Sequence, residues 1–359
     1  MIRRATLSLN AATGEKKEAI DNLIIEYLNF LQKVINMLWN HRIFFGKLVS
    51  KKWYKEIKSS LTERYKQCAA KQALAIVKSQ RKRDKKAKPN VHNASLELDS
   101  RFINIEAGRN SFDLWIKLSI LNGRPIYLPA KRHYHFNKFF TSADWKMLKS
   151  CRLRKTKKGL FLDVFFEKEA EPVKEEGEIV GLDLGFRKLA VLSDHQTVGK
   201  ELKQEINKFY NRKKSHLIIK EFINRELKMI DFSNIRILVV EQLKNVKKNK
   251  GRKAKRGKRF SRHANRLLSH WAYRHARSRL DMLCEENRVQ LAEQNPRGTS
   301  KVHNKCGRRG IRRGEIFVCP ACGDKVDADY NAACNIRDFW IAQGGYGPLP
   351  ENHLDIPFG

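Results

Sequence analysis

The stretch Ile179-Val180-Gly181-Leu182-Asp183-Leu184-Gly185 decides how the second half of the chain folds, because it places one carboxylate inside an otherwise apolar run. The apolar residues predict a buried strand, and Lys188–Ser193 follows as its hairpin partner. A lone ionised carboxylate in such a strand is costly to bury, so we expect a compensating group beside Asp183. A metal ion is one such group.

Two more carboxylates fall in comparable places. Glu241 ends the apolar strand Ile235–Val240, and Asp329 opens a predicted helix over 329–341. Carboxylates from separate elements suit Mg²⁺ or Mn²⁺, and two such ions can stabilise the attacking water and the leaving oxygen of a phosphodiester. Each acid alone has an ordinary explanation, as a turn partner, a solvated strand end or a helix cap. Together they predict a metal-dependent catalytic centre, with Asp327 as a rival for the last position.

Cysteine spacing indicates a second metal site. The segments His303-Asn304-Lys305-Cys306 and Cys319-Pro320-Ala321-Cys322-Gly323 each place two ligand residues around a two-residue gap. In a reducing compartment this spacing indicates metal ligation rather than disulfides, and four such ligands suit tetrahedral Zn²⁺. We therefore expect a structural zinc held by His303, Cys306, Cys319 and Cys322. For His303 the alternative is a solvent-exposed side chain or a phosphate contact.

The charge of the chain points to a polyanionic partner. Lys and Arg total 74 against 38 Asp and Glu, a formal net charge of +36. Nucleic acid is the usual partner for such an excess, because each neutralised phosphate releases a counterion. An anionic membrane is the competing polyanion, but no apolar run approaches the ~20 residues of a membrane span. The N-terminus also lacks the apolar stretch of a signal peptide, so we expect a cytoplasmic protein without a membrane partner.

The tract Lys244–Arg262 contains no acidic residue and cannot form a core. We expect it to be mobile without a partner and to contact a nucleic acid backbone, the alternative being a solvated loop that adds only long-range attraction. The candidate contacts are its basic residues Lys247, Lys248, Lys250, Arg252, Lys253, Lys255 and Arg256.

The first half of the chain predicts a strand at 2–9, helical character from Glu15 to about residue 83, and further strands over 100–168. This order indicates a β-barrel-like domain with a helical insertion. The aromatic residues of the helical block could stack bases, but core positions are the more frequent use of such residues. They are Trp39, Phe44, Trp53 and Tyr54.

Together these motifs resemble those of the TnpB-type transposon-encoded nucleases, and of their relatives the compact type V CRISPR effectors and Fanzor proteins. Residues 181–185 resemble the first RuvC motif, and Val239-Val240-Glu241-Gln242-Leu243 resembles the second. Thr299-Ser300 and the two cysteine knuckles, followed by the run 327–336, resemble the zinc ribbon and the third motif. In that family the Asp directly before x-Asn-Ala-Ala is catalytic, which favours Asp329 over Asp327.

Two features depart from the family. The first zinc position is usually Cys and is His303 here, and the segment between the first two RuvC motifs is short. The resemblance otherwise implies an α+β multidomain fold with a ribonuclease-H-like (RuvC) α/β domain and an inserted zinc ribbon. The implied parts are a β-barrel-like wedge domain (1–12 and 100–170), a helical recognition insertion (13–99), the RuvC-like nuclease domain (178–298 and 326–343) and the zinc ribbon (299–325). Composition adds a linker (171–177), which is acidic and contains Pro172 and Gly177, and a Gly/Pro-rich flexible tail (344–359).

The implied function is an Mg²⁺-dependent, RNA-guided DNA endonuclease directed by a transposon-derived guide RNA. It would bind that RNA and double-stranded and single-stranded target DNA, with base pairing supplying the sequence specificity. One alternative is a guided repressor that binds without cutting, which should have lost an acid. Another is a three-acid transposase acting on transposon ends, which the ribbon before the last Asp disfavours. A basic zinc-ribbon RNA-binding protein would leave the three carboxylates unexplained.

Overall fold

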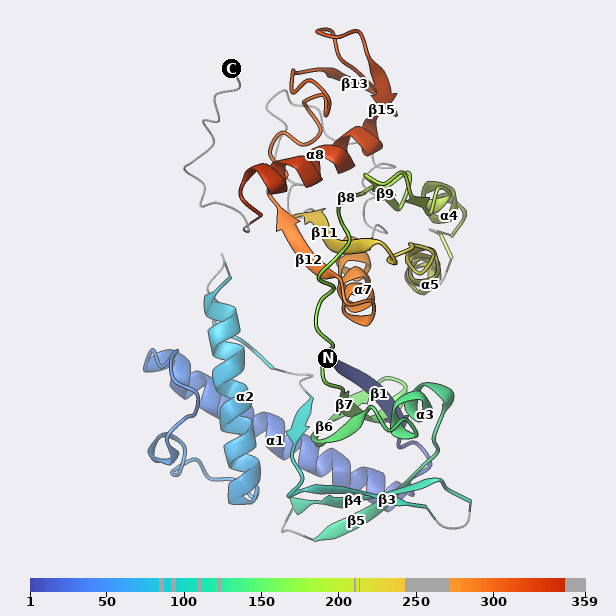
Figure 1. Cartoon of the computed structure of the whole chain (residues 1–359). Helices are drawn as coiled ribbons and strands as arrows, with labels where there is room; N and C mark the ends of the chain where they lie inside the picture. The colour runs from blue at the N-terminus through green and yellow to red at the C-terminus, as the bar shows by residue number, and fades with distance from the viewer. Residues whose placement is uncertain are drawn as a thin grey trace. The chain divides into compact units, whose positions relative to one another are not determined.

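The computed structural model describes residues 1–83, 87–91, 95–108, 111–121, 124–209, 211–212, 214–242 and 272–345. These divide into two compact units, 1–169 and 170–359 (Figure 1). Both units combine helices with sheets, which confirms a mixed α/β multidomain chain. No described helix has the length and apolar composition that a membrane span requires. The basic tract Lys244–Arg262, with all seven of its candidate contacts, lies outside the described residues, as do residues 346–359 of the predicted tail.

The described residues of the first unit form two separate antiparallel sheets, with strand orders β1-β7-β6-β2 and β3-β4-β5. Its elements are β1 (Ile2–Ser8), α1 (Gly14–Asn40), the short 3-10 helix η1 (Lys51–Trp53), α2 (Glu63–Arg81), β2 (Leu96–Leu98), β3 (Ile103–Ala107), β4 (Leu114–Ser119), β5 (Pro125–Ala130), α3 (Tyr134–Phe140), β6 (Lys146–Thr156) and β7 (Gly159–Glu167). The predicted β-barrel-like closure is wrong for the described residues. A barrel needs its first and last strands to pair, whereas β1 and β2 are the two edges of one sheet and β3 and β5 the edges of the other.

Helix α1 buries the face that its sequence predicts. Its residues Leu23, Tyr27, Phe30, Leu31, Val34 and Leu38 are all at most 1% exposed. The predicted helical character does reach almost to residue 83, since α2 ends at Arg81, but it is not continuous, because α1 ends at Asn40 and α2 begins only at Glu63. Arg42 adopts a φ of 54°, in the left-handed region that a right-handed helix cannot contain.

Of the four aromatic residues in this block, Tyr54 is buried and confirms the core interpretation. Trp39 and Phe44 are only partly buried against the core. The guanidinium of Arg81 lies 4.3 Å from the Trp39 ring centroid and 3.8 Å from that of Phe44. This contact holds the end of α1 to the end of α2.

The second unit contains a five-stranded sheet, ordered β10-β9-β8-β11-β12, and a smaller sheet, ordered β13-β14-β15. Its elements are β8 (Glu178–Leu184), β9 (Ala190–Leu192), β10 (Thr197–Val198), α4 (Leu202–Phe209), α5 (Ser215–Leu227), β11 (Ile235–Glu241), α7 (Tyr273–Glu286), β12 (Gln290–Gln294), β13 (Ile311–Arg313), β14 (Ile316–Val318), β15 (Lys325–Asp327) and α8 (Ala328–Ala342). Strand β8 is antiparallel to β9 and parallel to β11, which is parallel to β12. The predicted hairpin 179–193 and the strand 235–241 are confirmed.

Helices cover both faces of the five-stranded sheet (Figure 1). Alternate residues of β11 point to opposite faces, as strand geometry requires. Ile237 and Val239 pack with Ile336 and Trp340 of α8. Leu238 and Val240 belong to the larger core on the other face, which α5 and α7 cover. The small sheet lies between β12 and α8 in the chain, with His303 and Cys306 before its first strand and Cys319 and Cys322 between β14 and β15.

Candidate active site and metal site

Asp183 and Glu241 lie side by side at the carboxyl ends of neighbouring strands. In the parallel pair β8 and β11, Leu182 is in register with Val240, and each acid is the next residue of its strand. Both side chains are half-buried. Ligand sites in α/β sheets form beyond the carboxyl ends of parallel strands, so this edge of the sheet has the position of a ligand-binding or catalytic site.

The surroundings of Asp183 favour its neutral form. Burial, and after it the negative charges of Glu241 and Asp329, raise the pKa of this carboxyl to about 8, although Arg312 opposes them. The three predicted acids are therefore within electrostatic reach of one another. A cluster of like charges at a buried place is the arrangement that a bound cation would relieve.

Glu241 is held by a residue from the segment that enters the cysteine region. The hydroxyl of Thr299, a side chain only 1% exposed, donates a hydrogen bond of 2.5 Å to Oε1 of Glu241. Burial raises the pKa of Glu241, and the Thr299 hydrogen bond lowers it. The hydroxyl of Tyr273, at the start of α7, donates to the backbone oxygen of Glu241 at 3.1 Å. Side chain and backbone of this acid are thus both fixed.

Asp327 and Asp329 have different partners. Asp327 caps α8, since its Oδ1 accepts hydrogen bonds of 3.0 Å from the backbone N–H groups of Asp329 and Tyr330. It also forms an ion pair with Lys188. Burial would raise the pKa of Asp327, but the bonds to Lys188 and to the helix N–H groups keep it below its usual value. The Asp327 carboxylate is therefore already engaged, as the N-cap of α8 and as the partner of Lys188.

Asp329 lies in the first turn of α8 and is 6% exposed. Its Oδ1 accepts a hydrogen bond of 2.6 Å from the guanidinium of Arg312 on β13. This carboxylate, rather than that of Asp327, is the stronger charge acting on Asp183 after Glu241. Of this pair, Asp329 thus has the larger effect on the pKa of Asp183.

Two buried asparagines of α8 tie the cysteine region to the helix that carries Asp329. Asn331 donates to the Val302 oxygen at 2.8 Å and accepts from the Asn304 backbone at 2.9 Å. Asn335 donates to the Thr299 oxygen at 2.8 Å and to the Val302 oxygen at 2.9 Å. The run 331–335 therefore links the segment with Thr299 and the first knuckle to α8.

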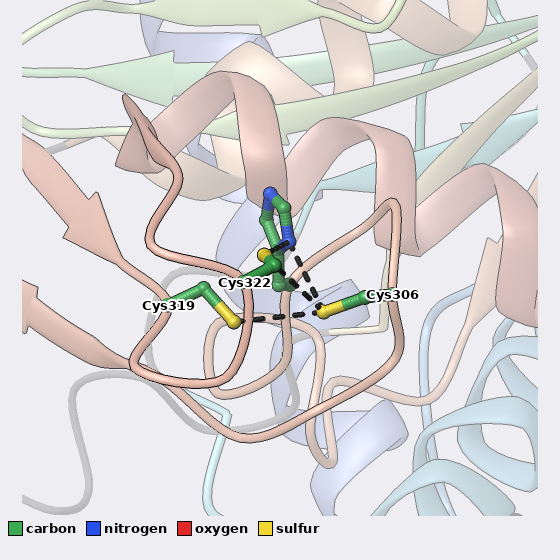
Figure 2. A group of neighbouring side chains, drawn as sticks. Cys306, Cys319 and Cys322 are labelled. Carbon is green, nitrogen blue, oxygen red and sulfur yellow. Dashed lines mark hydrogen bonds between the residues drawn. The ribbon is translucent and has the colours of Figure 1, made fainter.

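The four predicted zinc ligands meet at one point. Nδ1 of His303 is 3.3 Å from the sulfurs of Cys306 and Cys322, and the Cys306 sulfur is 3.5 Å from that of Cys319 and 3.7 Å from that of Cys322. All four ligand atoms lie within 4.8 Å of one another. Figure 2 shows the side chains of the three cysteines converging from two loops. A tetrahedral ion with ligand bonds of about 2.0–2.3 Å fits this spacing, and the N/S donor set suits zinc.

The two knuckles have the same backbone form. Gly307 and Gly323, which follow Cys306 and Cys322, both have positive φ, of 67° and 75°. Their N–H groups donate at 2.8 Å to the carbonyl oxygens of the first ligands, His303 and Cys319. Only glycine adopts this turn without strain. His303 thus takes the place in its knuckle that Cys319 takes in the other.

Sequence reasoning did not identify the roles of Thr299, Arg312 or Lys188. Thr299 was part of a recognised motif, but the motif assigned it no contact with Glu241. Arg312 is one of four arginines in the loop between the knuckles, with Arg308, Arg309 and Arg313, and nothing in the sequence distinguishes it from them.

Comparisons with known proteins agree with the motifs. Residues 273–336 match the family described as Cas12f1-like, TNB domain. A CRISPR-associated endodeoxyribonuclease Cas12f1 of Sulfoacidibacillus thermotolerans is 37% identical over 75 residues, 20% of this chain and 18% of that protein. A TnpB-like protein of Aquifex aeolicus is 32% identical over 111 residues, 30% of this chain and 34% of that protein. The matches thus span only about a fifth and a third of these relatives.

The fold has a relative over most of its length. The cryo-EM structure of a Cas12f1–sgRNA–target DNA complex matches with a TM-score of 0.57 at 13% sequence identity, covering 90% of this chain and 83% of that one. At this identity the match concerns the fold alone. With the family match at 273–336 and the two sequence relatives, it confirms the resemblance to TnpB-type and compact Cas12 proteins that the motifs predicted.

Proposed function

We propose that this chain is an RNA-guided DNA endonuclease that hydrolyses target DNA at a centre formed by Asp183, Glu241 and Asp329. The observation that supports it is the cluster of three carboxylates from β8, β11 and α8, two of which raise the pKa of the third. Uncompensated charges of one sign are costly at a buried place, and oxygen ligands from separate elements suit Mg²⁺ or Mn²⁺. Two such ions, when bound, would stabilise the attacking water and the leaving oxygen of a phosphodiester.

The protein's own residues would orient these ligands. Thr299 holds one oxygen of Glu241, and Arg312 holds one oxygen of Asp329. The helix cap and the ion pair of Asp327 fix the first turn of α8, which carries Asp329. Side chains held in this way are already oriented before cations and substrate bind.

Guide RNA and target DNA are the proposed partners. The Cas12f1 relative is named an endodeoxyribonuclease, and the structural neighbour is a complex with sgRNA and target DNA. The net charge of +36 suits polyanions of this kind. The basic tract Lys244–Arg262 is proposed as a backbone contact on its composition. A transposon-derived guide remains part of the proposal because of the resemblance to TnpB.

The domain layout is proposed as the motifs implied it. Residues 178–298 and 326–343 would form the RuvC-like nuclease domain, and the sheet order β10-β9-β8-β11-β12 supports a ribonuclease-H-like core. Residues 299–325 would form a zinc ribbon that holds one structural Zn²⁺ through His303 and three cysteines. Residues 1–12 with 100–170 would be the wedge domain, and 13–99 the recognition insertion.

One observation favours a second candidate, a guided repressor that binds target DNA without cutting it. The Arg312 guanidinium already occupies Oδ1 of Asp329, an oxygen that a cation would use. Cleavage would then require Arg312 to share or release this carboxylate. The experiment below separates the two candidates.

The test is to purify the full chain, sequence the RNA that copurifies, and offer DNA that matches this guide in the presence of Mg²⁺. We expect cleavage by the native protein, and none by Asp183→Ala, Glu241→Ala or Asp329→Ala, while guide and target binding persist. Binding without cleavage by the native protein would establish the repressor instead. Absence of any specific copurifying RNA would contradict the guided function altogether.

A further inference from the structure

The carboxylate of Asp324 lies beside the His303 ring nitrogen that does not face the cysteine sulfurs. His303 presents Nδ1 to the sulfurs of Cys306 and Cys322, each at 3.3 Å. Its other ring nitrogen, Nε2, faces Oδ2 of Asp324 at 3.5 Å. A neutral imidazole that uses the lone pair of one nitrogen as a ligand carries its hydrogen on the other. With Nδ1 on the metal side, Nε2 is therefore the N–H.

That N–H needs an acceptor. His303 is only 1% exposed, so water does not serve it. Among the described residues Nε2 makes no hydrogen bond, and 3.5 Å leaves the Asp324 carboxylate just beyond that range. Leaving a buried N–H unpaired is costly, and a carboxylate is the strongest acceptor a protein offers.

The position of Asp324 follows from the second knuckle. The left-handed turn at Gly323 brings Asp324 back toward Cys319, whose N–H donates at 3.0 Å to the backbone oxygen of Asp324. The His303 ring is held from another direction by Phe317, which lies parallel to it with centroids 6.1 Å apart. Ring and carboxylate come from different knuckles, and both have restricted movement.

We infer that Asp324 is a positioning residue for the metal cluster. When the metal is bound, the Asp324 carboxylate, 3.5 Å away in this structure, would accept the Nε2–H of His303, favour the tautomer with a free Nδ1, and hold that atom toward the three sulfurs. The inference rests on the proposed zinc. A cysteine at position 303 would not need this partner, because a thiolate offers one ligand atom and carries its own charge. The role of Asp324 therefore depends on the histidine.

Lys305 offers a competing explanation, since its ammonium lies 3.2 Å from the same oxygen of Asp324. In that case Asp324 would serve only a surface ion pair, with Lys305 69% exposed. Exposed pairs of this kind contribute little to stability. Lys305→Ala is therefore the matched control, because it removes this pair and leaves Asp324 facing His303.

The experiment measures zinc affinity by chelator competition in the full chain at fixed pH, with Co²⁺ absorption as a readout of sulfur ligation. Asp324→Ala should bind zinc about 10–100-fold more weakly. Asp324→Asn should stay within a few-fold of the native affinity, because its amide oxygen still accepts the N–H. Lys305→Ala should match the native protein. In a His303→Cys background, Asp324→Ala should cause little change.

Native affinity in Asp324→Ala would overturn the inference. An equal loss in the His303 and His303→Cys backgrounds would also overturn it, since Asp324 would then act through the fold of the loop. If Asp324→Ala does not fold in excess zinc, Asp324→Ser, whose hydroxyl is too short to reach Nε2, replaces it in the same comparison. A native chain that gives no cobalt–thiolate absorption would instead refute the zinc site itself.

Discussion

Gly181 of β8 lies directly against the backbone of α8 at Ala333. A Cβ built on Gly181 would be 2.0 Å from the carbonyl oxygen of Ala333 and 2.8 Å from the backbone nitrogen of Arg337. Even one methyl group would therefore force the helix away from the strand. Because Asp183 is two residues beyond Gly181 and Asp329 is one turn before Ala333, this contact sets how closely the two acids approach.

We therefore predict that Gly181→Ala lowers the free energy of unfolding by about 1–3 kcal/mol, as overpacking does. It should also reduce Mg²⁺-dependent cleavage, because α8 moves with Asp329. Thermal unfolding and cleavage rates measure the two effects. Gly14→Ala is the control, since nothing lies within 4 Å of a Cβ at that position. Equal unfolding temperatures and cleavage rates in the two variants would show that α8 tolerates the added methyl group.

Asp183→Asn should stabilise the metal-free protein while abolishing cleavage. The folded-state pKa of Asp183 is raised to about 8, so between its ordinary pKa and about pH 8 the folded chain binds a proton that the unfolded chain has released. The free energy of unfolding therefore falls as pH rises through this window. Asn removes that dependence, and we expect a gain of about 1–3 kcal/mol at about pH 8 and almost none at about pH 4. Denaturant titrations in EDTA at both values measure it, and a pH-independent difference would contradict the mechanism.

Thr299→Val should reduce cleavage by about 10–100-fold, as loss of a group that orients a metal ligand does. The Thr299 hydrogen bond lowers the pKa of Glu241 against the effect of burial, so its loss raises that pKa further. The acidic limb of the pH–rate profile should then move to higher pH. Thr299→Ser keeps the hydroxyl and should restore both rate and profile. A uniform rate loss with an unmoved profile would indicate a structural role only.

Asp327→Ala and Asp329→Ala should separate the two neighbouring acids. Asp327 caps α8, and loss of a cap costs about 0.5–2 kcal/mol of stability. Cleavage at a temperature where Asp327→Ala is folded should persist, whereas Asp329→Ala should abolish it. Asp327→Asn preserves the cap and is the control for stability. Full cleavage by Asp329→Ala, with loss in Asp327→Ala, would reverse the assignment.

Cys319→Ser should release the metal and unfold the cysteine region, because metal binding and folding are coupled at such sites. Elemental analysis should find one zinc per native chain and none in the variant. The hydrogen bonds of Asn331 to Val302 and Asn304 should weaken with the knuckle, so proteolysis near 299–325 should increase. Zinc retained in Cys319→Ser would show that another ligand set holds it.

Local patterns predicted the elements that carry the site. The apolar run with Asp183, the strand ending in Glu241 and the helix of Asp329 each have a periodicity that their own residues determine. The helical block was less predictable. Apolar residues at helical spacing on both sides of residues 41–62 predicted one continuous helical stretch, whereas the chain leaves α1 through a left-handed residue at Arg42. The number and closure of the sheets were not predictable either, because pairing such as β1 with β7 joins residues about 160 positions apart.

By itself the sequence determined the types of the candidate ligands, their spacing and the order of the three acids, because these depend on residue identity and short separations. The tertiary structure decided which of two neighbouring acids acts more strongly on Asp183 and which residues contact these acids. Thr299 meets Glu241 from 58 residues away, and Arg312 meets Asp329 across the small sheet. Such pairs depend on where α8 packs on β8, which follows from the fit of whole surfaces around Gly181 and not from any local pattern.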